Sequence, residues 1–576
     1  ARNIHVNAPV YGKTIRLTGG ASQYNYATGE ATALTATSGT PEYAIDGTAL
    51  GAMQADRIKV VVTEKGAGVK MSGDMAANAG ELTLSADGKI SIGNASGRDG
   101  VAITSKQKVT AARVTSRQKV SVQADQGITL QSVAADSDIV LASGTGLIGI
   151  SGDVNSGTTV QLSSGGGIAA GSVIAGNGAA TLVATSGDIA IAGAAIITGG
   201  LNLTATAGSI SANSLQSNQS IALNAGLDIA VAGNVQAQGN VSASGRSVSA
   251  GTIVSGINFA ATGANPSGNV VLGSGGSLSL TATGDNITTG NLLSAGALNA
   301  SATGNVSAGS IQSAGDLAIT AASLTSSGIT SHGALTVNTA SGRVDVSGQV
   351  LAASNVLISG AAIQAGAIAA GVDFAATSAN GGGVILGSAG TLGLTATTGN
   401  IVVDKLLSAG DLTAQASLLQ ANNITSHEAV GVTGGVNVAN QLLSAGNITI
   451  NGNANGVSAG LLASGVDFAA TKANGGNIVL SAGGGDLTIN DSAGAIQAGT
   501  VLAAGAINTT GQTITADTIT GHKDIVLSGA TSAAAGSGSV DIIGQVLGGG
   551  NVRVSGSGIQ ADAIVSGVDI AATNAA

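Results

Sequence analysis

Apolar and polar residues alternate along most of the chain in short runs, and each run ends at Gly, Asn or Ser. Asp316–Thr320 is a typical run, in which Leu317 and Ile319 alternate with polar or small residues. Such an alternation places all the apolar side chains on one face of an extended strand. The turn-forming residues end each strand after about five residues. The pattern therefore predicts many short β-strands, each with one buried face and one exposed face.

The runs recur with a nearly fixed step along the chain. Leu201, Ile221 and Val241 occupy equivalent places at a step of about 20 residues. A slightly shorter step relates a second set, Leu298, Leu317 and Leu335. Such a unit is too short for a strand–helix–strand crossover, but it holds three short strands and three corners. We therefore predict an all-β fold, a right-handed parallel β-helix (β-solenoid) with about 18–20 residues per coil.

A longer period of about 95 residues overlies this step. It relates His332, His427 and His522, each of which follows Ile-Thr-Ser or Ile-Thr-Gly. Five coils of about 19 residues would account for this period, and at about 4.8 Å per coil they would span about 24 Å. A histidine–zinc bond is only about 2 Å long, so histidines this far apart do not share a metal ion. We interpret the three histidines as duplicated corner residues.

A second duplicated motif, Gly-Val-Asp-Phe-Ala-Ala-Thr, begins at Gly371 and Gly465, with variants at Gly256 and Gly567. The phenylalanines and aspartates of these copies are Phe259, Phe374, Phe468, Asp373, Asp467 and Asp569. Alternation along a strand would point the phenylalanines inward, so we expect them to fill the core of wider coils. We expect the aspartates to form a solvated row on the opposite face.

The composition excludes several common classes of protein. The chain has 92 Gly, 3 Pro and no Cys, with 9% charged and 1% aromatic residues. Because aromatic side chains supply much of a conventional core, an ordinary globular core is not expected. Low charge and many β-branched residues argue against disorder. No stretch has the roughly 20 apolar residues of a membrane helix, and the lack of Cys excludes a disulfide scaffold.

Charge divides the chain into two zones. Residues 1–125 carry 14 Lys and Arg against 10 Asp and Glu, whereas residues 126–576 carry 6 against 20. All 4 Tyr and all 3 Met also lie in the first zone. We therefore expect an irregular, basic β-helix segment over residues 1–125. A regular β-helix shaft with the 95-residue super-repeat is expected over residues 126–576.

The first 90 or so residues resemble a known family. Gly20–Gly29, Tyr43–Met53, Ile58–Val60 and Glu64–Val69 resemble the segment that follows the secretion domain in filamentous haemagglutinins and contact-dependent growth inhibition exoproteins. The resemblance implies two-partner secretion through a dedicated outer-membrane transporter and display on the surface of a Gram-negative bacterium. The Asn-Pro-Asn motifs of the secretion domain are absent, so we expect the domain that recognises the transporter to lie upstream of this piece.

The resemblance predicts a secreted shaft, associated with the outer membrane, that displays adhesive or toxin-delivery domains toward neighbouring bacterial or host cells. An alternative is an adhesin that binds a polyanionic glycan through a basic patch. Ser105–Val109 and Ser116–Val120 are near-copies whose alternating cations are expected on one strand face. The candidate residues are Lys106, Lys108, Arg113, Arg117 and Lys119. A solvated face is the simpler interpretation, and nucleic acid is not expected, because aromatic stacking partners are missing.

Polysaccharide-processing enzymes are a remote alternative, because they also use parallel β-helices. Such enzymes need clustered carboxylates, cations and aromatic platforms for sugar rings. Only 3 Phe follow Tyr43, and only 6 cations follow residue 125. We therefore expect no enzymatic activity and no catalytic, cofactor or metal site.

Overall fold

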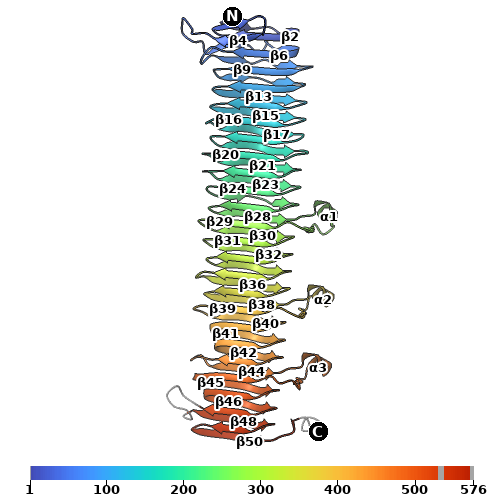
Figure 1. The fold of residues 1–576 in the computed structure, drawn as a ribbon, viewed down its shortest axis with the longest axis vertical. Helices are drawn as coiled ribbons and strands as arrows, with labels where there is room; N and C mark the ends of the chain where they lie inside the picture. The colour runs from blue at the N-terminus through green and yellow to red at the C-terminus, as the bar shows by residue number, and fades with distance from the viewer. Residues whose placement is uncertain (1, 530–537, 571–576) are drawn as a thin grey trace. The chain divides into compact units, whose positions relative to one another are not determined.

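The computed structural model describes residues 2–529 and 538–570. The chain divides into two compact units, unit 1 (Ala1–Gly296) and unit 2 (Ala297–Ala576). Unit 1 contains strands β1 (Ile4–Val6) to β30 (Ile287–Ser294) and helix α1 (Phe259–Ala264). Unit 2 contains strands β31 (Leu298–Ala302) to β50 (Gly558–Ser566) with helices α2 (Phe374–Ala379) and α3 (Phe468–Ala473). Within each unit, parallel strands are stacked in successive coils (Figure 1). The prediction of an all-β parallel β-helix is confirmed.

One coil of unit 1 shows how the chain winds. Strand β13 (Lys108–Ser116) pairs with two separate strands of the preceding coil, β10 (Ile90–Ile92) and β11 (Ala95–Gly97). It therefore bends between its two halves and supplies two sides of its own coil. Strand β12 (Gly100–Ser105) supplies the third side and pairs in parallel with β14 (Val120–Ala124) of the next coil. Each such coil has three sides and three corners.

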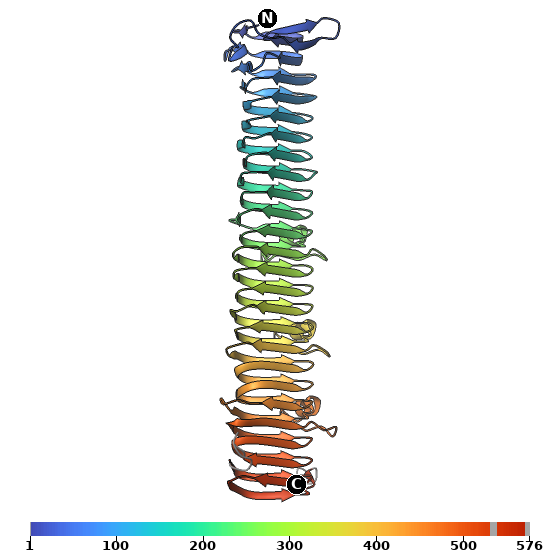
Figure 2. The ribbon, with the colours of Figure 1, turned by 60° about the vertical axis from the view of Figure 1, so that its left-hand side comes forward.

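The pairing register gives the length of each coil. In unit 1, Val120 pairs with Ile139 and Ile139 pairs with Val160, so each of these coils takes about 19–21 residues. In unit 2, Leu317 pairs with Leu335, which makes a coil of about 18 residues. The observed coil length is therefore close to the predicted one. Figure 2 shows the coils of each unit edge-on.

Small aliphatic side chains fill the interior of the coils. In β16 (Ile139–Ser143), Ile139 and Leu141 are buried, whereas Val140 between them is half-buried. Serines are also buried where a side of the coil ends, and their hydroxyl groups donate hydrogen bonds to backbone carbonyl oxygens at the corners. The Ser217 hydroxyl donates to the Gly199 carbonyl at 2.6 Å. This hydrogen bond avoids the cost of about 1–3 kcal/mol for a buried polar group without a partner.

The 95-residue period corresponds to four coils, so the predicted number of five coils is wrong. From Leu335 the register passes through Val356, Leu392 and Leu412 to Val430, which makes four steps for one period. The step from Val356 to Leu392 is much longer than the others, because part of that coil is extruded. Four coils at about 4.8 Å span about 19 Å, still much too far for shared metal ligation.

Each extruded segment contains a six-residue helix. These are α1 (Phe259–Ala264) in unit 1, and α2 (Phe374–Ala379) and α3 (Phe468–Ala473) in unit 2. The helices project from the side of the stacked strands, and α2 and α3 leave unit 2 on the same side (Figures 1 and 2). No helix in the part of the chain described here is long and apolar enough to cross a membrane.

The aspartates of the duplicated motif cap these helices and do not form a plain solvated row. The Asp373 carboxylate accepts from the backbone N–H of Ala376 at 2.9 Å, and Asp467 accepts from Ala470 at 2.9 Å. Asn258 plays the same part in α1. Asp569 belongs to a fourth copy of the motif, of which residues 571–573 lie outside the described residues. The capping position explains why Asp or Asn always precedes the aromatic residue.

The phenylalanines lie outside the solenoid core, so their predicted role in filling wide coils is wrong. Each Phe opens its helix and is half-buried. The Phe374 ring stacks on His332 with centroids 4.3 Å apart, and Phe468 packs against His427 at 4.9 Å. The histidines occupy corners, as expected, and burial lowers the pKa of His427. The prediction from strand alternation is wrong here because the chain leaves the sheet directly before each Phe.

The first coils of unit 1 are less regular than those that follow. Ile15 of β2 (Val10–Gly19) pairs with Ile58 of β6 (Met53–Val62), a much longer step than that of a regular coil. The intervening chain includes an antiparallel hairpin of β3 (Ser22–Asn25) and β4 (Glu30–Ala33). The regular step of about 19–21 residues begins with the pairing of Val69 and Ile90.

Candidate functional site

The five predicted cations do not share one strand face. All five side chains are exposed, but they occupy the three different corners of a single coil. Lys106 lies at the corner between β12 and β13, Lys108 is the first residue of β13, and Arg113 lies at the bend within β13. Arg117 and Lys119 lie at the corner before β14. The expected placement on one strand face is therefore wrong, whereas the binding of a polyanion by these residues stays a prediction.

Buried serines explain why the alternation of cations is broken. Ser105 and Ser116 end their strands with the side chain buried, and each hydroxyl oxygen accepts from the backbone N–H two residues later, at 3.0 Å from Gln107 and 2.9 Å from Gln118. Such a local hydrogen bond turns the chain out of the sheet. Lys106 and Arg117, which directly follow these serines, consequently lie on turns.

The charge of Lys106 is neutralised within the protein. Its ammonium group forms an ion pair with Asp87 at 2.8 Å. Asp87 follows Ala86, which pairs with Ser105 one coil later, so the two charges face each other across adjacent coils. The hydrogen bond and the charge of Asp87 raise the pKa of Lys106. Lys106 itself therefore offers little free positive charge.

The corner that holds Arg117 is different, because a second arginine precedes it by one coil. Gly97 pairs with Ser116, which places Arg98 beside Arg117 at equivalent positions of adjacent coils. Among the residues that the structure describes, neither guanidinium has an ion pair or a hydrogen-bond acceptor. Asp136 occupies the corresponding place one coil further on, after Ala135, which pairs with Ser116.

Arg98 was missed from the sequence because it lies outside the two near-copy segments. The signal that would have found it is the coil step itself, since Arg98 and Arg117 are separated by one full coil. Like charges that recur at the coil step lie beside each other on adjacent coils, whereas charges that alternate along one strand need not.

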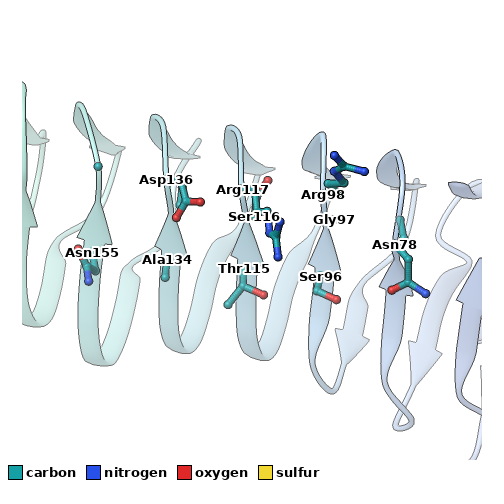
Figure 3. A pocket seen from close by; sticks show the side chains of 13 residues that line it. Asn78, Ser96, Gly97, Arg98, Thr115, Ser116, Arg117, Ala134, Asp136 and Asn155 are labelled. Atoms are coloured by element: carbon teal, nitrogen blue, oxygen red, sulfur yellow. The ribbon is translucent and has the colours of Figure 1, made fainter. Parts of the chain in front are cut away.

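A hollow of about 550 Å³ lies over this corner and the adjoining side of the coils. Asn78, Arg98, Arg117 and Asp136 line it from the turns, one from each of four successive coils (Figure 3). A second row, on the neighbouring strands, consists of Ser96, Thr115, Ala134 and Asn155. The hollow is therefore lined by two cations, hydroxyl and amide groups, and one carboxylate.

Other clusters of charged residues do not suggest chemistry. No group of three His, Cys, Asp or Glu suited to a metal ion occurs among residues 2–529 and 538–570. The buried Glu64 is held by Arg2, whose guanidinium donates at 2.8 Å, and by the backbone N–H of Ala21 at 2.8 Å. The hydrogen bond from Arg2 holds the pKa of Glu64 below its usual value despite burial. This ion pair ties the first strands of unit 1 to their neighbours.

Comparison with known proteins concerns the first coils. A family model described as the TPS secretion domain matches residues 1–92. The tRNA nuclease CdiA-2 of Burkholderia pseudomallei (strain 1026b) is 43% identical over 90 residues. The tRNA nuclease CdiA of Escherichia coli (strain NC101) is 38% identical over 94 residues. The alignments cover 16% of this chain and only 3% of each of these relatives, and no solved structure matches the chain.

The matched range corrects one expectation from the sequence. Residues 1–92 match the secretion domain itself, whereas the resemblance placed them after that domain. The parallel register passes from this range into the following coils through the pairing of Leu82 with Val101. The matches and the β-helical fold together identify the chain as part of a two-partner-secretion exoprotein of the contact-dependent growth inhibition and filamentous haemagglutinin family.

Proposed function

We propose that the chain joins a secretion domain to the shaft of a surface filament that carries toxin or adhesive domains toward neighbouring cells. An outer-membrane transporter of the two-partner type is the proposed export partner. The observation that carries the proposal is continuity, since the coils matching the secretion domain pair directly with the coils that follow. A solenoid built in this way extends by adding coils, each of which contacts only its neighbours.

The extruded helices support a spacer role for the coils. Although α2 and α3 interrupt the sequence repeat, the strands on either side keep their parallel pairing, Val356 with Leu392 and Ile448 with Leu487. We further propose that the shaft itself is not enzymatic. Toxin delivery is favoured over host adhesion because the relatives are named as nucleases and a toxin, although the matched region excludes their nuclease parts.

Export of engineered parent proteins tests this proposal. One variant lacks residues 1–92, and the control variant lacks residues 330–424, which is a deletion of similar size within unit 2. With the partner transporter co-expressed, we expect the first variant to remain inside the cell and the second to reach the surface. Immunoblots of surface and periplasmic fractions measure the outcome. Normal export without residues 1–92 would contradict the proposed division of labour.

A further inference from the structure

Arg98 and Arg117 form a like-charge pair that the protein itself does not neutralise. Equivalent positions of adjacent coils are about 4.8 Å apart, a spacing at which two cations repel each other. Two other corner cations of unit 1 each meet a carboxylate on an adjacent coil. Lys106 pairs with Asp87, and Arg246 donates to Asp228 at 3.0 Å. The arginine pair departs from this arrangement and leaves its donors free for a ligand.

The surroundings of the pair indicate what kind of ligand would fit. Beside the two arginines lie the hydroxyl groups of Ser96 and Thr115, with the amide of Asn155 further along the hollow (Figure 3). A volume of about 550 Å³ lies within the size range of small-molecule sites. Hydroxyl and amide groups bind sugar hydroxyls, and a guanidinium binds a planar carboxylate through paired hydrogen bonds.

Nearby carboxylates restrict the charge of that ligand. Asp136 faces the hollow from the coil after Arg117, and Asp99 follows Arg98 in the chain. Two cations with two carboxylates close by favour a ligand with one negative charge over a densely charged polymer, because the further charges of a polymer would lie near the carboxylates. The hollow is lined by no aromatic ring, which disfavours nucleic acid, whose bases need stacking partners.

We propose that the hollow binds a sugar residue bearing a single carboxylate, such as a uronic acid within a cell-surface polysaccharide. Arg98 and Arg117 hold the carboxylate, while Ser96, Thr115 and Asn155 contact the ring hydroxyls. Asp136 accepts from a ring hydroxyl group of the neighbouring sugar. The site would give the shaft a lateral contact with a polysaccharide layer, separate from export and from the display of other domains.

Titration calorimetry on the whole chain with trigalacturonate as the probe tests this inference. Arg98→Gln with Arg117→Gln removes both guanidiniums, and we expect at least a tenfold loss of affinity. Lys106→Gln with Lys108→Gln is the matched control, because it removes the same charge close by, and less than a threefold change is expected. All four side chains are exposed, and circular dichroism checks that each variant folds.

Two further comparisons separate a built site from general electrostatic attraction. Maltotriose, which is neutral, should not bind, and a heparin hexasaccharide should bind more weakly than trigalacturonate. Arg98→Lys with Arg117→Lys keeps the charge but loses the paired donors, so it too should lower affinity about tenfold. Equal losses in the arginine and control pairs, full affinity in the lysine variant, or no binding of trigalacturonate at all would each overturn the proposal.

Discussion

Asp491 is a carboxylate on the inward face of a strand. It is 1% exposed and shares that face of β45 (Leu487–Ala503) with Leu487 and Ile489. Its partner on the adjacent coil is Gly511, which leaves room for the side chain. Neither carboxylate oxygen has a well-placed hydrogen-bond partner among the described residues. Burial raises the pKa of Asp491, and the nearby N–H groups of Gly494 and Ala493 only partly offset this effect.

A raised pKa means that the folded state binds a proton more readily than the unfolded state. The protonated form therefore contributes stability below the ordinary carboxyl pKa of about 3.9, and that contribution is lost as the pH rises through the folded-state pKa. Ionisation of Asp491 as the pH rises consequently destabilises its coil.

We predict that Asp491→Asn raises the free energy of unfolding of unit 2 at pH 7 by about 1–3 kcal/mol, because it removes a poorly solvated charge. The gain should shrink toward zero at pH 3. Denaturant titrations at the two pH values measure the effect, and the exposed Asp517→Asn serves as the control. A gain of equal size at both pH values would show that ionisation is not the cause.

At the scale of the elements, the extruded helical segments follow one plan. Each begins at a glycine with positive φ, such as Gly465 at 70°, a conformation that favours glycine. Each closes through an antiparallel bridge, Val466 with Leu480 in the case of α3. This segment covers an outward apolar patch of Leu443 and Ala463, against which Phe468 packs. Its contacts are thus separate from the interior of the solenoid.

We predict that Asp467→Ala loosens the α3 segment without disturbing the coils. Loss of an N-cap costs about 0.5–2 kcal/mol, and a helix as short as α3 has little stability to lose. Hydrogen exchange should quicken for residues 466–480, while the pairing of Val457 with Ile496 keeps its protection. Asp404→Asn, at an exposed strand position, is the control. Loss of protection in both regions would mean that the segment is needed to close the solenoid.

At the scale of the whole molecule, the solenoid should tolerate the deletion of whole coils but not the deletion of part of a coil. Stability in a solenoid is nearly a sum of terms from each coil and from its contacts with its neighbours. Ile329 and Ile424 occupy equivalent places four coils apart, because Leu335 and Val430 are related by the same register. Residues 330–424 are therefore a structurally complete block that includes α2.

We predict that deletion of residues 330–424 leaves a folded chain and shortens unit 2 by about 19 Å, four coils at about 4.8 Å. Deletion of only residues 344–352 should be more damaging. An odd number of residues turns inward side chains outward, so the apolar column of that coil would face water. Circular dichroism and limited proteolysis compare the two variants. Better folding after the shorter deletion would refute the modular description.

The fold class followed from local pattern, and so did the coil length. An alternation of two, as in Asp316–Thr320, assigns the faces of a strand wherever the chain stays extended. A repeat of about 19 residues leaves few other ways to pair such strands. The resemblance in the first 90 or so residues also identified the family, although it misplaced those residues relative to the secretion domain.

Which side chains contact one another across coils could be seen only in the tertiary structure, because these contacts depend on the register between coils. The chain leaves the sheet at Gly371, so residues counted as a fifth coil became α2, and Phe374 came to lie on His332 two coils earlier. Lys106 and Arg117 likewise lie at different corners of one coil, whereas Arg98 and Arg117 lie side by side at the same corner of adjacent coils. Local alternation specifies which way a side chain points. Neighbours across coils depend on how many residues each corner or extruded segment consumes, and backbone hydrogen bonds between coils set that number.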